Sequence, residues 1–304
     1  LTLVSGTPVI TSDQAAKTAV YYTPDTGNLI PIYNGASMVP TEFSELTLTL
    51  NSSGHASNTI YDVFVWSESG VLTIGTGPAW DNSSAGSGSR GTGASTTQLT
   101  RVKGLWVNAV DITARNGSTT YNVNANFATY VGSIFIDSSA GQATDHVSYG
   151  QSRKRSLWNA YNKKQIVLRA GDATTSWTHN STWRASRNTA GNSLTAFCGL
   201  PDERVRVEFA QVHSVPTTPG QIGAAYLGIG WNSTSSPSGR HTITQFNNGD
   251  ASASFTVSAT TPAVYEALPF IGINVATSLE QSVTVTSTFL GAELNMLLTA
   301  RYMG

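Results

Sequence analysis

The sequence has a single cysteine and few charged side chains. Cys198 stands alone among 304 residues, which excludes an intramolecular disulfide. It lies in the apolar run LTAFCGL, a setting that predicts a buried and inert thiol. Only 12% of the residues are charged, against a usual share of about 25%, and the net charge is −1. A nearly neutral chain has no general attraction to nucleic acid or to membrane surfaces, so we expect neither as a partner.

Signatures of membrane insertion and of metal or cofactor chemistry are also missing from the sequence. No apolar run approaches the ~20 residues of a membrane span. The start, LTLVSGTPVI, lacks the basic and apolar segments of a signal peptide. The five histidines are scattered without metal-ligand spacing, and no calcium-loop pattern occurs. We therefore expect no membrane span, no metal and no cofactor.

The chain instead offers one short strand pattern after another, separated by turn residues. The runs 60–66 (IYDVFVW) and 71–75 (VLTIG), joined by SESG, predict a hairpin. In ERVRVEF (203–209) apolar and charged residues alternate, as in a half-buried strand. Strand spacing also places Leu294, Met296, Leu298, Ala300 and Tyr302 on one face. Together these patterns predict an all-β fold of one or two antiparallel sandwich or jelly-roll-like units, with very little helix.

One low-complexity stretch interrupts the strand patterns. Residues 81–97, DNSSAGSGSRGTGASTT, have the composition of a flexible linker. Strand patterns resume directly afterwards, over 99–112, and for that reason we predict a long surface loop. We place a soft domain boundary near residue 125. It divides the chain into an N-terminal β domain (1–125) and a C-terminal β-sandwich domain (126–304).

Basic and aromatic residues concentrate in residues 153–187, which we call the basic window. It holds eight of the 17 basic residues and one acid, Asp172, so its charge is +7 while the rest of the chain is −8. Cations this close repel one another unless anions or rings compensate them. Because local acids are lacking, we predict that the window contacts a neighbouring subunit or a host surface, anchored by Trp158 and Tyr161. The residues of this predicted binding or interface surface are Arg153, Lys154, Arg155, Trp158, Tyr161, Lys163, Lys164, Trp177, Trp183 and Arg184.

Aromatic faces beside arginine and lysine are also the composition of sites for sugars, anionic glycans or nucleic acid strands. We favour the interface interpretation. The basic window belongs to an otherwise acidic chain, which argues against nucleic acid as the ligand.

No catalytic constellation is recognisable in the sequence. VLRAGDAT (167–174) has a strand followed by Gly-Asp, as in some hydrolases, but the nucleophile position holds Ala173 and no histidine follows near the C-terminus. A glycosidase would need two acids flanking a bond. Asp137 and Asp145, with Asp172 as a third, are the acids to test, yet nothing in the sequence brings them together. We predict no catalytic residues.

Four stretches of the chain are similar to one known family. They are residues 1–35, the strand YDVFVW, TYVGSIFID (129–137) and RSLWNAYNKKQIVLRAGDATTSW (155–177). In these phrases the sequence resembles phage and prophage virion proteins of the tail-fibre or head-fibre (head-spike) kind, over most of residues 1–212. The resemblance implies a β-rich appendage, often trimeric in fibres, that attaches to the particle or touches the host surface.

The expected function is accordingly that of a non-enzymatic virion structural protein, a fibre, spike or decoration subunit. Such a protein is made in the bacterial host cytoplasm and carried on the extracellular particle, with residues 1–125 as the docking part. Its expected partners are copies of itself, with a trimer favoured, other virion proteins and host surface polysaccharide. Two alternatives stay open: a tailspike-like glycan depolymerase, and a bacterial surface adhesin, which needs an export signal upstream of Leu1.

Overall fold

The computed structural model describes residues 1–250 and 252–304, and nearly all of its regular structure is β. The helical part of this described chain is one three-residue 3-10 turn, η1 (Ser186–Asn188). The strands pair mainly antiparallel in several sheets. The prediction of an all-β, sandwich-like fold is therefore confirmed. The described residues include no helix long and apolar enough to cross a membrane.

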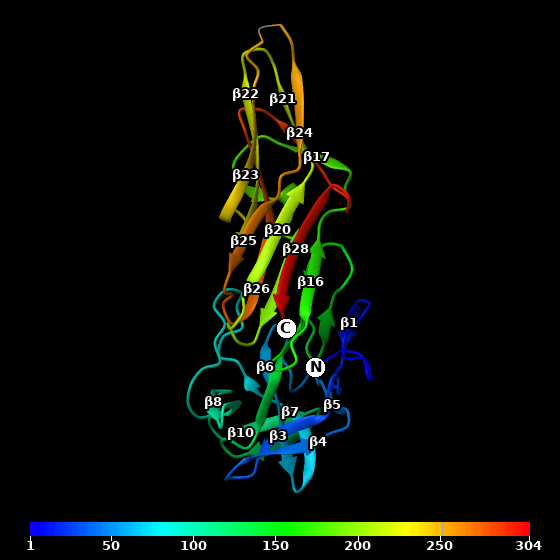
Figure 1. The fold of residues 1–304 in the computed structure, drawn as a ribbon, viewed down its shortest axis with the longest axis vertical. Coiled ribbons are helices and arrows are strands. Elements are labelled where there is room, and N and C mark those ends of the chain that lie inside the picture. Colours follow the sequence, from blue (N-terminus) through cyan, green and yellow to red (C-terminus); the bar gives the residue numbers. More distant parts are fainter. Residues whose placement is uncertain (251) are drawn as a thin grey trace.

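The N-terminal part of the chain forms an eight-stranded sheet, at the lower end of the molecule in Figure 1. Seven strands follow the order β11-β10-β7-β6-β12-β9-β8, and β15 also pairs with β12. Their bounds are β6 (Ile60–Glu68), β7 (Val71–Ala79), β8 (Leu99–Val102), β9 (Leu105–Asn108), β10 (Ile112–Asn116), β11 (Thr119–Val123), β12 (Thr129–Phe135) and β15 (Leu157–Asn159).

The predicted hairpin at the centre of this sheet is confirmed, because β6 pairs antiparallel with β7 and places Val65 opposite Ile74. Ser69 and Gly70 turn the chain between them, with φ of 51° and 87°. Two successive residues at positive φ match the right-handed twist of paired strands. These two residues alone connect β6 to β7.

Strand β6 is buried from Ile60 to Trp66 because other parts of the molecule cover both of its faces. Tyr61, Val63 and Val65 face one apolar cluster, while Ile60 and Phe64 face another. Small two-stranded units add side chains to the first cluster and complete this end of the molecule. Their strands are β1 (Gln14–Lys17) with β13 (Ala143–Asp145), β2 (Ala19–Tyr22) with β5 (Leu46–Thr49), and β3 (Leu29–Tyr33) with β4 (Met38–Glu42).

The C-terminal part has the strand order of a jelly roll. One face runs β16-β28-β20-β25 and the other β19-β26-β22-β23, with β14 (Arg153–Lys154) and β18 (Arg184–Ala185) as short additions. The two faces are joined at one edge, where β23 pairs with β25 at Arg240 and Val264. Apart from the β22–β23 hairpin, which lies on one face, successive strands of the two faces alternate between them, as in double-sheet jelly rolls. Their bounds are β16 (Gln165–Ala170), β19 (Ser193–Cys198), β20 (Val205–Gln211), β22 (Ile222–Trp231), β23 (Ser238–Asn247), β25 (Ala263–Ala267), β26 (Gly272–Val283) and β28 (Met296–Met303).

Side chains from both faces fill the core of the jelly roll. Val205, Val207 and Phe209 point inward from β20, as their alternation predicts. Strand β28 buries Met296, Leu298, Ala300 and Tyr302 in the same core. Leu294 does not join them: it lies before the strand and is 98% exposed, so its predicted place on that face is wrong.

A four-stranded sheet, β17-β27-β21-β24, extends the jelly roll to the upper tip in Figure 1. Its strands are β17 (Ser176–His179), β21 (His213–Thr217), β24 (Phe255–Ala259) and β27 (Ser287–Leu290). Both chain termini lie near the middle of the elongated molecule, where the N-terminal part meets the jelly roll (Figure 1). The predicted domain division at residue 125 stays a prediction; strands β12 and β15, which follow that residue, belong to the N-terminal sheet.

An apolar joint connects the two parts of the molecule. Phe64, Tyr130 and Trp158 from the N-terminal sheet pack in one cluster with Phe197 and Ile273 from the jelly roll. Burying large aromatic side chains contributes roughly 1.5–3 kcal/mol each. The two parts are therefore held as one unit by a shared core.

Candidate functional site

The basic window is compensated within the chain itself. Each of its eight basic side chains lies within ion-pair distance of an acid that sits elsewhere in the sequence, with the exception of Arg187, which pairs with the window's own Asp172. The window does lack acids of its own apart from Asp172, but acids from distant parts of the chain compensate it, so its charge does not by itself require an outside partner. The pairs are Arg153–Asp13 (2.8 Å), Lys154–Asp137, Arg155–Asp145 (3.3 Å), Lys163–Asp202 (2.6 Å), Lys164–Asp25 (2.8 Å), Arg169–Glu293 (3.1 Å), Arg184–Glu280 (2.7 Å) and Arg187–Asp172 (3.1 Å).

These ion pairs tie the window to both parts of the molecule. Asp13 and Asp25 come from the N-terminal segment, whereas Glu280 and Glu293 come from the jelly roll. Strand β14 of the window also pairs parallel with β19. The window is thus a seam between the two parts. Whether it also contacts a second subunit or a host surface stays a prediction.

Arg155 and Asp145 form the most enclosed pair of this seam. The Asp145 side chain is fully buried, and its Oδ1 accepts a hydrogen bond from the backbone N–H of Ser156 at 2.5 Å. Burial raises the pKa of Asp145, and the positive charge of Arg155 opposes this rise. A buried carboxylate depends on its cation, because an uncompensated buried charge is costly. Arg155 is therefore a structural residue.

Trp158 does not anchor a surface, and that part of the prediction is wrong. Its side chain is 1% exposed, on a strand that pairs with β12, and its ring stacks near Tyr130 at 6.5 Å. The Lys163 Nζ lies 4.7 Å from the centre of the Trp158 ring. Tyr161, by contrast, is partly exposed, and its hydroxyl oxygen accepts a hydrogen bond from the backbone N–H of Trp106 at 3.1 Å.

Trp177 and Arg184 converge on one buried carboxylate of the jelly roll. The Trp177 Nε1–H donates to Glu280 Oε2 at 2.7 Å, and the Arg184 Nε–H donates to Oε1 at 2.8 Å. Burial raises the pKa of Glu280, while these donors lower it. Trp183 lies elsewhere: its ring meets those of Tyr226 (6.0 Å) and His241 (5.8 Å) edge-on. The ten predicted residues thus do not form one site.

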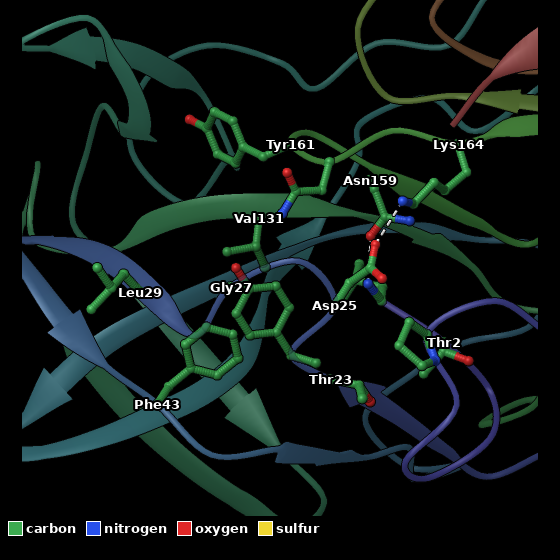
Figure 2. A pocket seen from close by; sticks show the side chains of 14 residues that line it. Thr2, Thr23, Asp25, Gly27, Leu29, Phe43, Val131, Asn159, Tyr161 and Lys164 are labelled. Atoms are coloured by element: carbon green, nitrogen blue, oxygen red, sulfur yellow. Dashed lines mark hydrogen bonds and ion pairs between the residues drawn. The ribbon is translucent and has the colours of Figure 1, made fainter.

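Tyr161 and Lys164 border a small hollow at the seam, shown in Figure 2. Its volume is about 70 Å³. Tyr22 and Phe43 stack at 4.7 Å on one side, and Asp25 and Lys164 meet across it. Ligand pockets usually measure about 300–1,000 Å³. The hollow therefore has room for a few water molecules or one substituent of a ligand, and it does not hold a whole sugar.

The three acids considered for a glycan depolymerase are all buried. Asp137, Asp145 and Asp172 have low exposure, and each is paired with a cation of the basic window. Asp172 also accepts hydrogen bonds from Gln151 and Asn192. A catalytic carboxylate must reach the bond that it cleaves. These three positions offer substrate no access, and they give the depolymerase alternative no support.

Comparisons with known proteins assign the chain to no family. No family model matches it, and no curated protein matches it. Among solved structures, an insecticidal delta-endotoxin from Bacillus thuringiensis aligns over 96% of this chain and 53% of its own, at 9% identity and a TM-score of 0.19. The chain thus spans about half the length of that toxin. A structure of the infectious bursal disease virus Gx strain aligns over 95% and 79%, at 12% identity and a TM-score of 0.11.

Likenesses at such low TM-scores carry no argument about fold or function. None of the comparisons tests the resemblance to phage virion proteins, which stays a prediction. Within residues 1–250 and 252–304, no group of three or more histidine, cysteine, aspartate or glutamate side chains is arranged to hold a metal ion.

Proposed function

We propose that this chain is a structural subunit of a bacteriophage particle, a fibre, spike or decoration protein carried on the head or tail. The observation that carries the proposal is the jelly-roll strand order, with β16-β28-β20-β25 packed on β19-β26-β22-β23. Jelly rolls recur in viral capsid and lectin domains. This is an argument from fold analogy, and the resemblance of residues 1–212 to virion appendage proteins supports it independently.

The distribution of charge supports a structural role as well. The basic side chains of the window form ion pairs within the chain, and these pairs join the two parts of the molecule. The acids that a depolymerase would use are buried in the same pairs. A chain with few charges, whose two parts are joined by internal ion pairs, suits a subunit that must keep its shape outside the cell.

Self-association is the expected mode of assembly, and one exposed surface favours it. On the outer side of the β23-β22-β26 sheet, Ile222, Ile243 and Val283 are all more than 40% exposed. Tyr226 lies opposite Ile243 in the strand register. We call Ile222, Tyr226, Ile243 and Val283 the outer patch. Exposed apolar patches mark interaction sites, and we propose that copies of the chain meet on this face of the sheet as a homotrimer.

Sedimentation equilibrium of the purified chain tests this assembly. We expect a mass of three chains for the parent protein. The substitution Ile243→Asp should shift it to one chain while the circular dichroism spectrum stays unchanged, because a charge is placed in the proposed contact. Leu294→Asp is the matched control: it puts the same charge at an exposed aliphatic residue outside the outer patch and should leave the trimer intact. A parent protein that sediments as a monomer contradicts the proposed assembly.

A further inference from the structure

A polar groove on the N-terminal sheet is unconnected with the basic window. It has a volume of about 550 Å³ and lies over strands β7, β10 and β11, beside the turn that contains Gly54. Thr113 and Asn122, which pair across β10 and β11, line it together with Asn124 and Tyr61. This volume falls within the range of about 300–1,000 Å³ that small-ligand sites occupy. The groove is therefore large enough for one or two sugar rings.

Arg115 lines this groove without a carboxylate partner. Among the arginines of the described residues, Arg101 and Arg240 likewise form no ion pair, but Arg101 stacks on Trp106 at 4.4 Å and Arg240 is exposed. Arg115 is half-buried, and it is neither stacked on an aromatic ring nor fully exposed to water. A cation that is partly withdrawn from water is stabilised when an anion binds to it. The guanidinium of Arg115 is thus available to a ligand.

The titratable groups on which the charge of Arg115 acts carry no negative charge at pH 7. They are His55 and Tyr61, and burial raises the pKa of Tyr61 above its ordinary value. His55 is fully buried: its Nδ1 accepts a hydrogen bond from the Asn51 N–H (3.0 Å), and its Nε2 lies 3.0 Å from Thr76 Oγ1. Burial lowers the pKa of His55 to about 4, so this ring is neutral at pH 7. Arg115 is accordingly the charged group at this end of the groove.

Asp111 is the one carboxylate that lines the groove. It stands four residues before Arg115 along an extended chain, which separates their backbones by about 13 Å. Its Oδ1 accepts the Ala125 N–H at 2.8 Å. The groove therefore has a cationic end at Arg115 and an acceptor end at Asp111, with amide and hydroxyl groups between them. This order of groups matches a sugar that carries one anionic substituent and several hydroxyls.

We infer that the Arg115 groove binds an anionic saccharide, with Arg115 holding the oxyanion and Thr113, Asn122 and Asn124 hydrogen-bonding the ring hydroxyls. The oxyanion is a uronic-acid carboxylate or a sugar phosphate, which a guanidinium recognises in the same two-pronged way. The inference rests on the proposed function for its setting, since it names the class of host surface polysaccharide that the particle would contact.

Isothermal titration calorimetry of the full chain with three probes tests the inference. The probes are trigalacturonate, glucose 6-phosphate and the neutral maltotriose. We expect at least one anionic probe to bind, with an affinity that falls as salt rises, and maltotriose to bind at least tenfold more weakly. Binding of trigalacturonate alone identifies the carboxylate, and binding of glucose 6-phosphate alone identifies the phosphate. Failure of both, or equal binding of maltotriose, overturns the inference.

Three variants locate the ligand at this groove. Arg115→Ala should weaken binding at least tenfold, and Arg115→Lys should weaken it less, because lysine keeps the charge and loses the fork. Gly54→Ala should also weaken binding, since an added methyl group would collide with Cδ and Nε of Arg115. Arg240→Ala is the control and removes the same charge from the jelly roll. Parent-like affinity in both Arg115→Ala and Gly54→Ala contradicts the site. The oligomeric state of these variants is measured separately, and a trimer that binds no saccharide would contradict the groove without contradicting the proposed assembly.

Discussion

Arg90 and Asp62 form a two-pronged ion pair beneath the glycine-rich loop, with Nε–Oδ2 at 2.6 Å and Nη2–Oδ1 at 3.1 Å. Asp62 is fully buried on β6, and Arg90 is nearly so. The Nη2 of Arg90 also donates a hydrogen bond, at 2.8 Å, to the carbonyl oxygen of Gly199 in the jelly roll. The loop 81–97, predicted from composition as a surface loop, therefore places one arginine inside the joint between the two parts.

The first prediction concerns this ion pair. Arg90→Met should lower the free energy of unfolding by about 3–5 kcal/mol, because it leaves the buried carboxylate of Asp62 without its cation. Urea denaturation followed by tryptophan fluorescence measures the change. The double variant Asp62→Asn with Arg90→Met should recover part of the loss. Arg101→Met, at an exposed arginine stacked on Trp106, is the control and should cost less than about 1 kcal/mol.

The second prediction compares two ion pairs of the basic window that differ in exposure. Arg155→Ala should destabilise the chain by about 3–5 kcal/mol, because the buried Asp145 loses its counter-charge. Lys164→Ala should cost about 1 kcal/mol or less, because the Lys164 side chain is 47% exposed and water screens its pair with Asp25. Chemical denaturation of both variants measures the two costs. Equal costs would show that burial does not set the strength of the seam.

Replacing several basic residues of the window at once would test stability before it tests assembly. Replacing Arg153, Lys154 and Arg155 together by alanine removes the partners of Asp13, Asp137 and Asp145 at once. We expect this triple variant to unfold at a lower denaturant concentration than the parent. A loss of assembly in this variant would therefore not show that the three residues lie at an interface. Single substitutions at exposed positions separate the two effects.

The third prediction concerns pH. The unfolded His55 takes up its proton near pH 6.5, whereas the buried ring stays neutral until about pH 4. Protonation between these values favours the unfolded chain, so stability should fall as the pH drops from 6.5 to 4, by about 3 kcal/mol from this residue. Below pH 4 this contribution is constant. Denaturation at several pH values, parent against His55→Gln, isolates the effect. A pH-independent difference between the two proteins would contradict it.

The fourth prediction concerns the lone thiol. Cys198 is buried, and burial raises its pKa to about 12. Since the thiolate is the reactive form, Cys198 should not react with a thiol-specific reagent at pH 8 until the chain unfolds. Absorbance at rising urea concentrations measures this, and the reaction should track the loss of fluorescence. A cysteine introduced at the exposed Ser181 should react at once in the folded chain. Rapid labelling of native Cys198 would show that the joint opens.

Much of the fold could be predicted because strand signals are local. The hairpin of β6 and β7 follows from two apolar runs separated by SESG, of which Ser69 and Gly70 form the turn, and the alternation in β20 follows from period-two burial. The same reasoning failed at Leu294, because spacing alone cannot show where a strand begins. Leu294 lies before β28, in a turn closed by the Met296 N–H, which donates to the Ala292 carbonyl oxygen at 2.9 Å.

The candidate site could not be predicted to the same extent because its contacts are long-range. Arg153 and Asp13 are 140 positions apart, and no local pattern connects them. From its charged sequence neighbours, Trp158 is expected to be exposed. In the structure it lies on β15, and its ring packs between the N-terminal sheet and the jelly roll. Arg115 was missed for the opposite reason. It is the single charged residue of its strand, and its lack of a carboxylate partner becomes evident only once the ion pairs of the folded chain are known.

The presence of the chain in purified particles tests the proposed function most directly. Phage particles banded on a density gradient and washed at high salt should retain this chain, in a copy number divisible by three when measured by quantitative mass spectrometry. Antibodies against the chain should label the particle at an appendage or on the head in electron micrographs. If the chain remains in the soluble fraction of the lysate and no peptides from it accompany infectious particles, the account of a virion structural subunit is contradicted.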